Sequence, residues 1–144
     1  MNDARNNQAV QDILAGLDVD MVGVARIEDI ENSEVAKQAL DLLPVCRSIV
    51  AFAMEIWPEF LDLTVPHRTA GAPKMNDLLD RHKNYLRGRL IRAAYDVAKE
   101  SRKQGFKALP MPGEGPSVDN RFLKAIISYK EAARLAGLGD LGMS

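Results

Sequence analysis

The chain has 144 residues, of which 47% are hydrophobic and 27% are charged, with 19 basic and 20 acidic side chains. This is the size and composition of an ordinary globular protein, and it excludes collagen, a coiled coil and an intrinsically disordered protein. The net charge is therefore close to zero and provides no general attraction to nucleic acid or to an anionic membrane, so neither is expected as a partner.

Cysteine content and the N-terminal sequence predict the compartment. A single cysteine, Cys46, excludes an internal disulfide, and one thiolate cannot by itself hold an iron–sulfur cluster or a zinc finger. The first twenty residues lack the basic start and the apolar run of a signal peptide, and no stretch approaches the roughly 20 apolar residues of a membrane span. We expect a soluble, cytoplasmic protein that folds as one domain over residues 1–144.

Hydrophobic periodicity predicts alternating helices and strands in the first part of the chain. Helices are expected over residues 8–17 and 34–43, the second with Ser33 as its N-cap. A short β-branched strand is expected over residues 21–27. The nearly continuous apolar run 48–54 predicts a strand that is covered on both faces.

The second part of the chain predicts one long helix followed by shorter elements. Residues 75–104 repeat apolar side chains on one face, and Gly105 is the expected C-cap. A short strand is expected over residues 106–109 and a helix over 121–135. Together these patterns predict an α+β fold, with a small mixed sheet packed by helices that include one long helix.

Two segments rich in proline and glycine, residues 57–74 and 110–119, are the expected loops and the candidate binding elements. The chain contains no GxGxxG, Walker, GxSxG or HExxH motif. His67 and His82 lie fifteen positions apart, which is not a spacing that brings metal ligands together, and no metal site is expected. Cys46 has no neighbouring base and is expected to be an unreactive thiol.

Charge is unevenly distributed along the chain. Residues 1–66 hold four basic and twelve acidic side chains, whereas residues 67–108 hold eleven basic and four acidic ones. The basic segment is suited to phosphate or another anion, although a solvated helix face is the commoner explanation of such a pattern. Its cations include Arg68, Lys74, Arg81, Lys83, Arg87, Arg89 and Arg92.

Tyr129 and Asp119 are the candidate proton-transfer groups near the C-terminal glycines. Each also has a structural interpretation, because a tyrosine on a helix face packs in a core and an aspartate before a helix caps it. The sequence leaves both interpretations open.

The last part of the chain carries a family resemblance. Residues 128–142, SYKEAARLAGLGDLG, resemble the helix and the glycine turn of epoxyqueuosine reductases and of the related reductive dehalogenases. Residues 21–25 and 47–54 are similar to the first two strands of that family. Of these segments, the glycine turn is the most specific.

The resemblance implies a cobalamin-dependent reductase in which a nitroreductase-like α+β domain holds the corrinoid and two iron–sulfur clusters supply electrons. The chain would correspond to the N-terminal part of such an enzyme, a partial domain without the cluster cysteines and not catalytically competent alone. By the same resemblance, Tyr129 or Asp119 would donate a proton. The cofactor-binding residues would be Ala136, Gly137, Leu138, Gly139 and Gly142.

Two other functions remain open from the sequence. A flavin-binding nitroreductase-like module would hold FMN through the basic middle segment and would dimerise. A non-enzymatic interaction or oligomerisation domain would expose apolar surface and bind either a C-terminal partner half or a second copy of itself.

Overall fold

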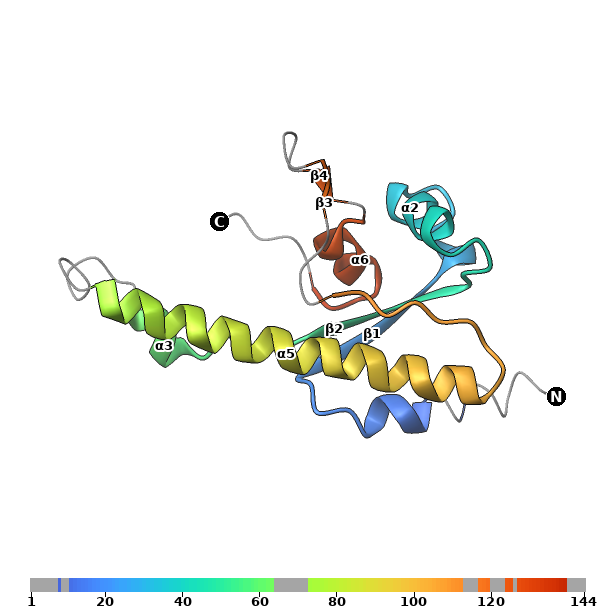
Figure 1. Ribbon diagram of the computed structural model, residues 1–144. Helices are drawn as coiled ribbons and strands as arrows, with labels where there is room; N and C mark the ends of the chain where they lie inside the picture. Colours follow the sequence, from blue (N-terminus) through green and yellow to red (C-terminus); the bar gives the residue numbers. More distant parts are fainter. Residues whose placement is uncertain are drawn as a thin grey trace.

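The computed structural model describes the backbone and side chains of most of the chain and the backbone alone of residues 73–76, 117–119 and 124–125. The residues described are 8, 11–63, 73–112, 117–119, 124–125 and 127–139. Within them the chain forms helices and strands, including a two-stranded antiparallel sheet and one long helix (Figure 1). This confirms the α+β class, whereas the predicted mixed sheet is not found, because the described strands pair only in the antiparallel direction.

The central sheet consists of the two strands expected from the apolar runs. β1 (Met21–Arg26) pairs with β2 (Ser48–Ala53), and Gly23 lies opposite Ala51. Side chains alternate between the two faces of a strand, so Gly23 and Ala25 share one face. Ala25 is buried there, while residues 49–53 of β2 are half-buried. The sheet is therefore only partly covered, in contrast to the complete covering that the apolar run predicted.

The connection between β1 and β2 contains a short 3-10 helix, η1 (Ile27–Asp29), and the helix α2 (Glu34–Leu42). Ser33 is the N-cap of α2, as predicted, because its hydroxyl accepts a hydrogen bond of 3.1 Å from the Ala36 N–H. Residues 11–15 are helical, within the expected helix 8–17.

The longest element is α5 (Pro73–Lys103), which confirms the predicted long helix. It ends as expected at Gly105, which has a φ of 88°. The preceding segment, predicted to be a loop, contains the short helix α3 (Pro58–Asp62), which begins with a proline in its first turn as helices commonly do. The rest of that predicted loop, residues 64–72, lies outside the described residues.

Two sequence predictions in the C-terminal part are wrong. Residues 106–109 form no strand, since no other described segment pairs with their backbone. The expected helix over 121–135 begins only at Tyr129, as α6 (Tyr129–Leu135). Upstream of it, β3 (Ser117–Asp119) and β4 (Lys124–Ala125) pair with each other, so residues 124–125 belong to a strand and not to the predicted helix.

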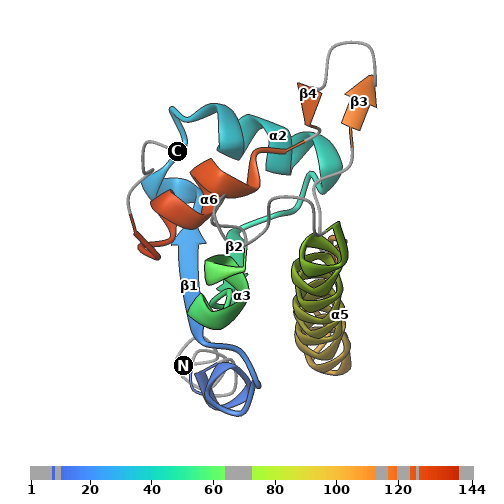
Figure 2. The ribbon, with the colours of Figure 1, turned by 90° about the vertical axis from the view of Figure 1, so that its left-hand side faces the viewer.

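The helices lie on two sides of the sheet. In Figure 1 the sheet lies between α5 and the pair α2 and α6, and in Figure 2 α2 and α6 lie above the sheet while α5 lies to its right. A small core joins α2 to α6 and consists of Val35, Ala39, Ile127 and Ala132, with Ile49 of β2 packed against it. None of the described helices combines the length and apolar character needed to cross a bilayer.

Candidate functional site

The candidate site is the turn that follows α6, and its position depends on how α6 begins. Ser128 is the N-cap, with its hydroxyl accepting a hydrogen bond of 3.3 Å from the Glu131 N–H. The Ser128 N–H in turn donates to the side-chain oxygen of Gln38 on α2 at 3.2 Å. This contact attaches the start of α6 to α2 and so determines where the C-terminal end of α6 lies.

The turn itself is a Schellman motif, the commonest glycine-based helix end. The Leu138 N–H donates to the Ala133 carbonyl and the Gly137 N–H to the Arg134 carbonyl, both at 3.0 Å. Gly137 has a φ of 83°, the left-handed conformation that the motif requires at this position. The first glycine of the turn therefore closes α6.

The turn packs against Gly23 of β1. A Cβ atom at Gly23 would lie 2.3 Å from the Ala136 carbonyl oxygen and 3.0 Å from a methyl carbon of Leu138. Cβ atoms essentially never approach a backbone oxygen as closely as 2.3 Å, so no side chain fits between β1 and the turn as they are placed. The glycine in the strand allows the two backbones to come into direct contact.

The other side of the turn is open. A Cβ atom at Gly137 or at Gly139 would have no heavy atom within 4 Å, outside its own neighbours. Gly139 has a φ of 147°, which L-residues with a side chain rarely adopt. Among the described residues, no side chain lies over this part of the turn, which is the kind of surface that a flat ligand can approach closely.

Tyr129 connects α6 to the segment that follows α5. Its hydroxyl donates a hydrogen bond of 2.8 Å to the Pro112 carbonyl, and burial raises the pKa of this phenol above its usual value. A phenol is protonated at neutral pH even without this shift, which is the state that a proton donor needs, and the shift makes the hydroxyl a weaker acid. The same contact is sufficient to hold residues 110–112 against α6.

The raised pKa of Tyr129 predicts a late ionisation step in the folded protein. Because the folded-state pKa exceeds that of the unfolded chain, the contribution of this group to stability is complete below the unfolded pKa and is lost as the pH rises through the folded value. In an absorbance titration of tyrosinate, we expect an ionisation step above the usual pKa of tyrosine. Tyr129→Phe should remove that late step, and a late step that persists would contradict the assignment.

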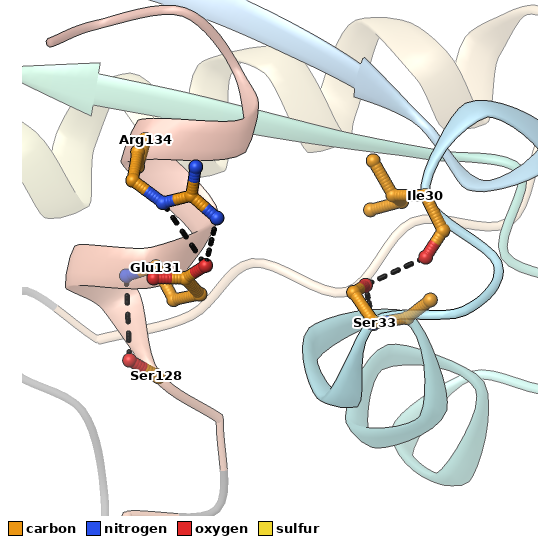
Figure 3. Close-up of polar contacts among 6 residues, drawn as sticks. Ile30, Ser33, Ser128, Glu131 and Arg134 are labelled. Atoms are coloured by element: carbon orange, nitrogen blue, oxygen red, sulfur yellow. Dashed lines mark hydrogen bonds and ion pairs between the residues drawn. The ribbon is translucent and has the colours of Figure 1, made fainter. Parts of the chain in front are cut away.

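A charged pair lies on α6 beside the turn. The Arg134 guanidinium hydrogen-bonds the Glu131 carboxylate, with 3.0 Å from Nε to Oε1, and this bond lowers the pKa of Glu131. Figure 3 shows the pair on α6 with the Ile30–Ser33 segment across from it. Next to them is a shallow hollow of about 300 Å³, formed by Leu135 and residues 28–33.

The other candidate residues have structural partners. His82 accepts a hydrogen bond of 3.1 Å from the Trp57 N–H and is buried. Burial raises the pKa of the Cys46 thiol, although a backbone hydrogen bond with Ser48 lowers it in part, and this agrees with an unreactive thiol. Among the described residues, no group of three histidine, cysteine or acidic side chains is placed to hold a metal ion. His67 lies outside the described residues.

The structure thus brings part of the predicted site together. Ala136, Gly137, Leu138 and Gly139 form the turn and Tyr129 begins the helix before it, whereas the side chain of Asp119 and the whole of Gly142 lie outside the described residues. The sequence prediction did not identify Gly23 as a functional neighbour. A glycine inside a β-branched strand was the available signal, since it commonly marks close backbone approach.

Comparison of the chain with known protein families, with curated proteins and with solved structures finds no match.

Proposed function

We propose that this chain supplies the corrinoid-binding turn of a cobalamin- and iron–sulfur-dependent reductase of the epoxyqueuosine reductase or reductive dehalogenase type, within a nitroreductase-like fold. The observation that carries the proposal is the contact between Gly23 and the turn at residues 136–138. These two segments resemble that family separately in sequence, and they are in contact in the structure. Neither the strand nor the turn depends on the other for its local conformation.

The open side of the turn fits a large flat ligand. The Cβ positions of Gly137 and Gly139 are unobstructed, so a corrin ring could approach the backbone without meeting a side chain. Bound cobalamin would supply the redox chemistry, with the cobalt held by the ring itself. Electrons would have to come from clusters outside this chain, because its single cysteine cannot ligate them.

Within this proposal Tyr129 is the first candidate proton donor. The hydroxyl is protonated at neutral pH and has a defined orientation toward the Pro112 carbonyl. Asp119, in β3, is the second candidate. The backbone of residues 136–139 would bind the ligand, and Gly142 would extend that surface.

The test is a titration of the protein with hydroxocobalamin, followed by the visible spectrum before and after reduction and by comigration in gel filtration. A base-off spectral change with comigration is expected. Gly137→Ala should weaken binding by about tenfold, because a methyl group then stands between the ring and the turn, and a tenfold change corresponds to about 1.4 kcal/mol.

Gly105→Ala is the matched control for that variant. Gly105 also closes a helix with a left-handed φ, of 88°, and a Cβ atom there meets nothing within 4 Å. Both substitutions should lower the free energy of unfolding by a similar amount, about 1–2 kcal/mol, because alanine is strained in the left-handed conformation. Only Gly137→Ala should also reduce cobalamin binding. Equal losses in the two variants, or no binding by the unmodified protein, would refute the proposal.

A further inference from the structure

The outward face of α5 carries a continuous stripe of exposed residues. They follow one another at alternating spacings of four and three positions, which places them on one side of a helix, and all are exposed. We call this set the α5 stripe: Arg81, Tyr85, Gly88, Arg92, Tyr95, Lys99 and Arg102.

The α5 stripe contains four cations and no carboxylate. Arg81 pairs with Asp77 at 2.8 Å, whereas Arg92, Lys99 and Arg102 have no ion-pair partner within the part of the chain that the structure describes. Between these cations, Tyr85 and Tyr95 are 57% and 52% exposed. A surface that combines unpaired cations with exposed phenol rings fits an anionic partner that also has apolar area.

Gly88 lies at the middle of the α5 stripe. A glycine inside an exposed helix costs about 1 kcal/mol relative to alanine, and a Cβ atom at this position would meet nothing within 4 Å. No contact within the described structure therefore requires a glycine there. Gly88 therefore leaves the exposed surface between Tyr85 and Arg92 without a side chain.

The same chain carries a surface of the opposite charge. The acidic segment, residues 28–34, holds four exposed carboxylates and no cation. Glu28 pairs with Arg26 at 2.8 Å, whereas Asp29 and Glu31 have no ion-pair partner among the described residues. A hollow of about 300 Å³ lies at this segment, and its lining combines the apolar Ile30 and Leu135 with the carboxylates. This combination suits the side chain of an arginine or a tyrosine.

The two surfaces cannot meet within one molecule. The acidic segment joins β1 to α2, and in Figure 2 this connection lies to the left of β2 whereas α5 lies to the right. The α5 stripe faces away from the sheet, since Leu79, Leu86 and Ala93 on the opposite side of the helix are the buried ones.

We propose that the α5 stripe of one copy docks on the acidic segment of a second copy. The contact joins two different surfaces, so it is head-to-tail, and it extends to longer assemblies unless the geometry closes a ring. Exposed ion pairs are individually weak and are screened by salt, so the association is expected to be reversible and to weaken as ionic strength rises. The inference does not rest on the proposed reductase function.

Charge-reversal variants test the pairing in the full chain by sedimentation velocity at low and high salt. Arg92→Glu with Lys99→Glu removes the basic surface, and Asp29→Lys with Glu31→Lys removes the acidic one. Each double variant should self-associate at least about tenfold more weakly than the unmodified chain at low salt, because attraction at two exposed pairs becomes repulsion. Circular dichroism confirms that each variant keeps its fold.

Mixing the two double variants gives the decisive result. The intact acidic surface of the first and the intact basic surface of the second can still pair, and the two reversed surfaces are again opposite in charge. The mixture should therefore recover the association that each double variant loses alone. Lys107→Glu with Lys130→Glu, a matched charge reversal at exposed residues outside both surfaces, should associate like the unmodified chain.

Three outcomes would overturn the proposal. One is an unmodified chain that stays monomeric at low salt, and another is a mixture of the two variants that stays monomeric. The third is association that the basic-surface variant abolishes and the acidic-surface variant leaves intact, because the α5 stripe would then dock on a different surface of the second copy.

Discussion

Gly23→Val is expected to lower the free energy of unfolding by about 2–3 kcal/mol, the range found when side-chain atoms are forced into a closely packed contact. Even the first added carbon would lie 2.3 Å from the Ala136 carbonyl oxygen, and that oxygen belongs to backbone held by the helix end. The turn would have to move away from β1. Urea denaturation followed by circular dichroism measures the loss, and Gly23→Ala should give a smaller loss of the same sign.

Gly88→Ala is the control for this prediction, because the glycine has no neighbour within 4 Å and lies inside a helix. This substitution should raise the free energy of unfolding by up to about 1 kcal/mol. Measurement at high salt separates the effect from self-association. A Gly23→Val protein with the stability of the unmodified chain would show that the turn does not rest on β1.

The second large effect is expected at His82, which connects α3 to α5. The Nε2 atom accepts a hydrogen bond from the Trp57 N–H, and the ring stacks on Phe60 with 4.2 Å between centroids and 7° between planes. His82→Phe keeps an aromatic ring but removes the acceptor. The Trp57 N–H is then left without its partner, and we expect a loss of about 1–3 kcal/mol.

Trp57 is the only tryptophan of the chain and lies 5.5 Å from the His82 ring, so its fluorescence reports on this contact directly. In His82→Phe, the fluorescence emission of Trp57 in the folded state should change, and the unfolding midpoint of the variant should change as well. His82→Gln, which retains a side-chain acceptor, should recover part of the stability. If His82→Phe matched the unmodified chain in both readouts, the hydrogen bond would not be what attaches α3 to α5.

Elements with a strong local signal were predictable from the sequence. The strands β1 and β2, the helix α5, the N-cap Ser33 and the C-cap Gly105 all depend on periodicity or on a side chain within a few positions. The glycine turn was predictable for the same reason, since the left-handed residue closes the helix that precedes it.

The errors arose where a distant or competing partner decides the structure. Residues 106–109 have the composition of a strand but lack a pairing segment among the described residues, and Phe106 remains 45% exposed. The helix expected from residue 121 begins only after Ser128, whose hydroxyl caps the Glu131 N–H. The backbone of Lys124–Ala125 pairs with β3. Backbone groups that hydrogen-bond a neighbouring strand cannot also make the hydrogen bonds of a helix.

The amino-acid sequence determines the order of the main elements, their ends and the left-handed glycines, because these features are set by interactions within one or two helical turns. Only the tertiary structure decides that the glycine turn rests on Gly23, that Tyr129 bonds Pro112 and that His82 receives the Trp57 N–H. Each of these contacts joins segments that are far apart along the chain. Their formation depends on which faces pack together, and local patterns do not encode that choice.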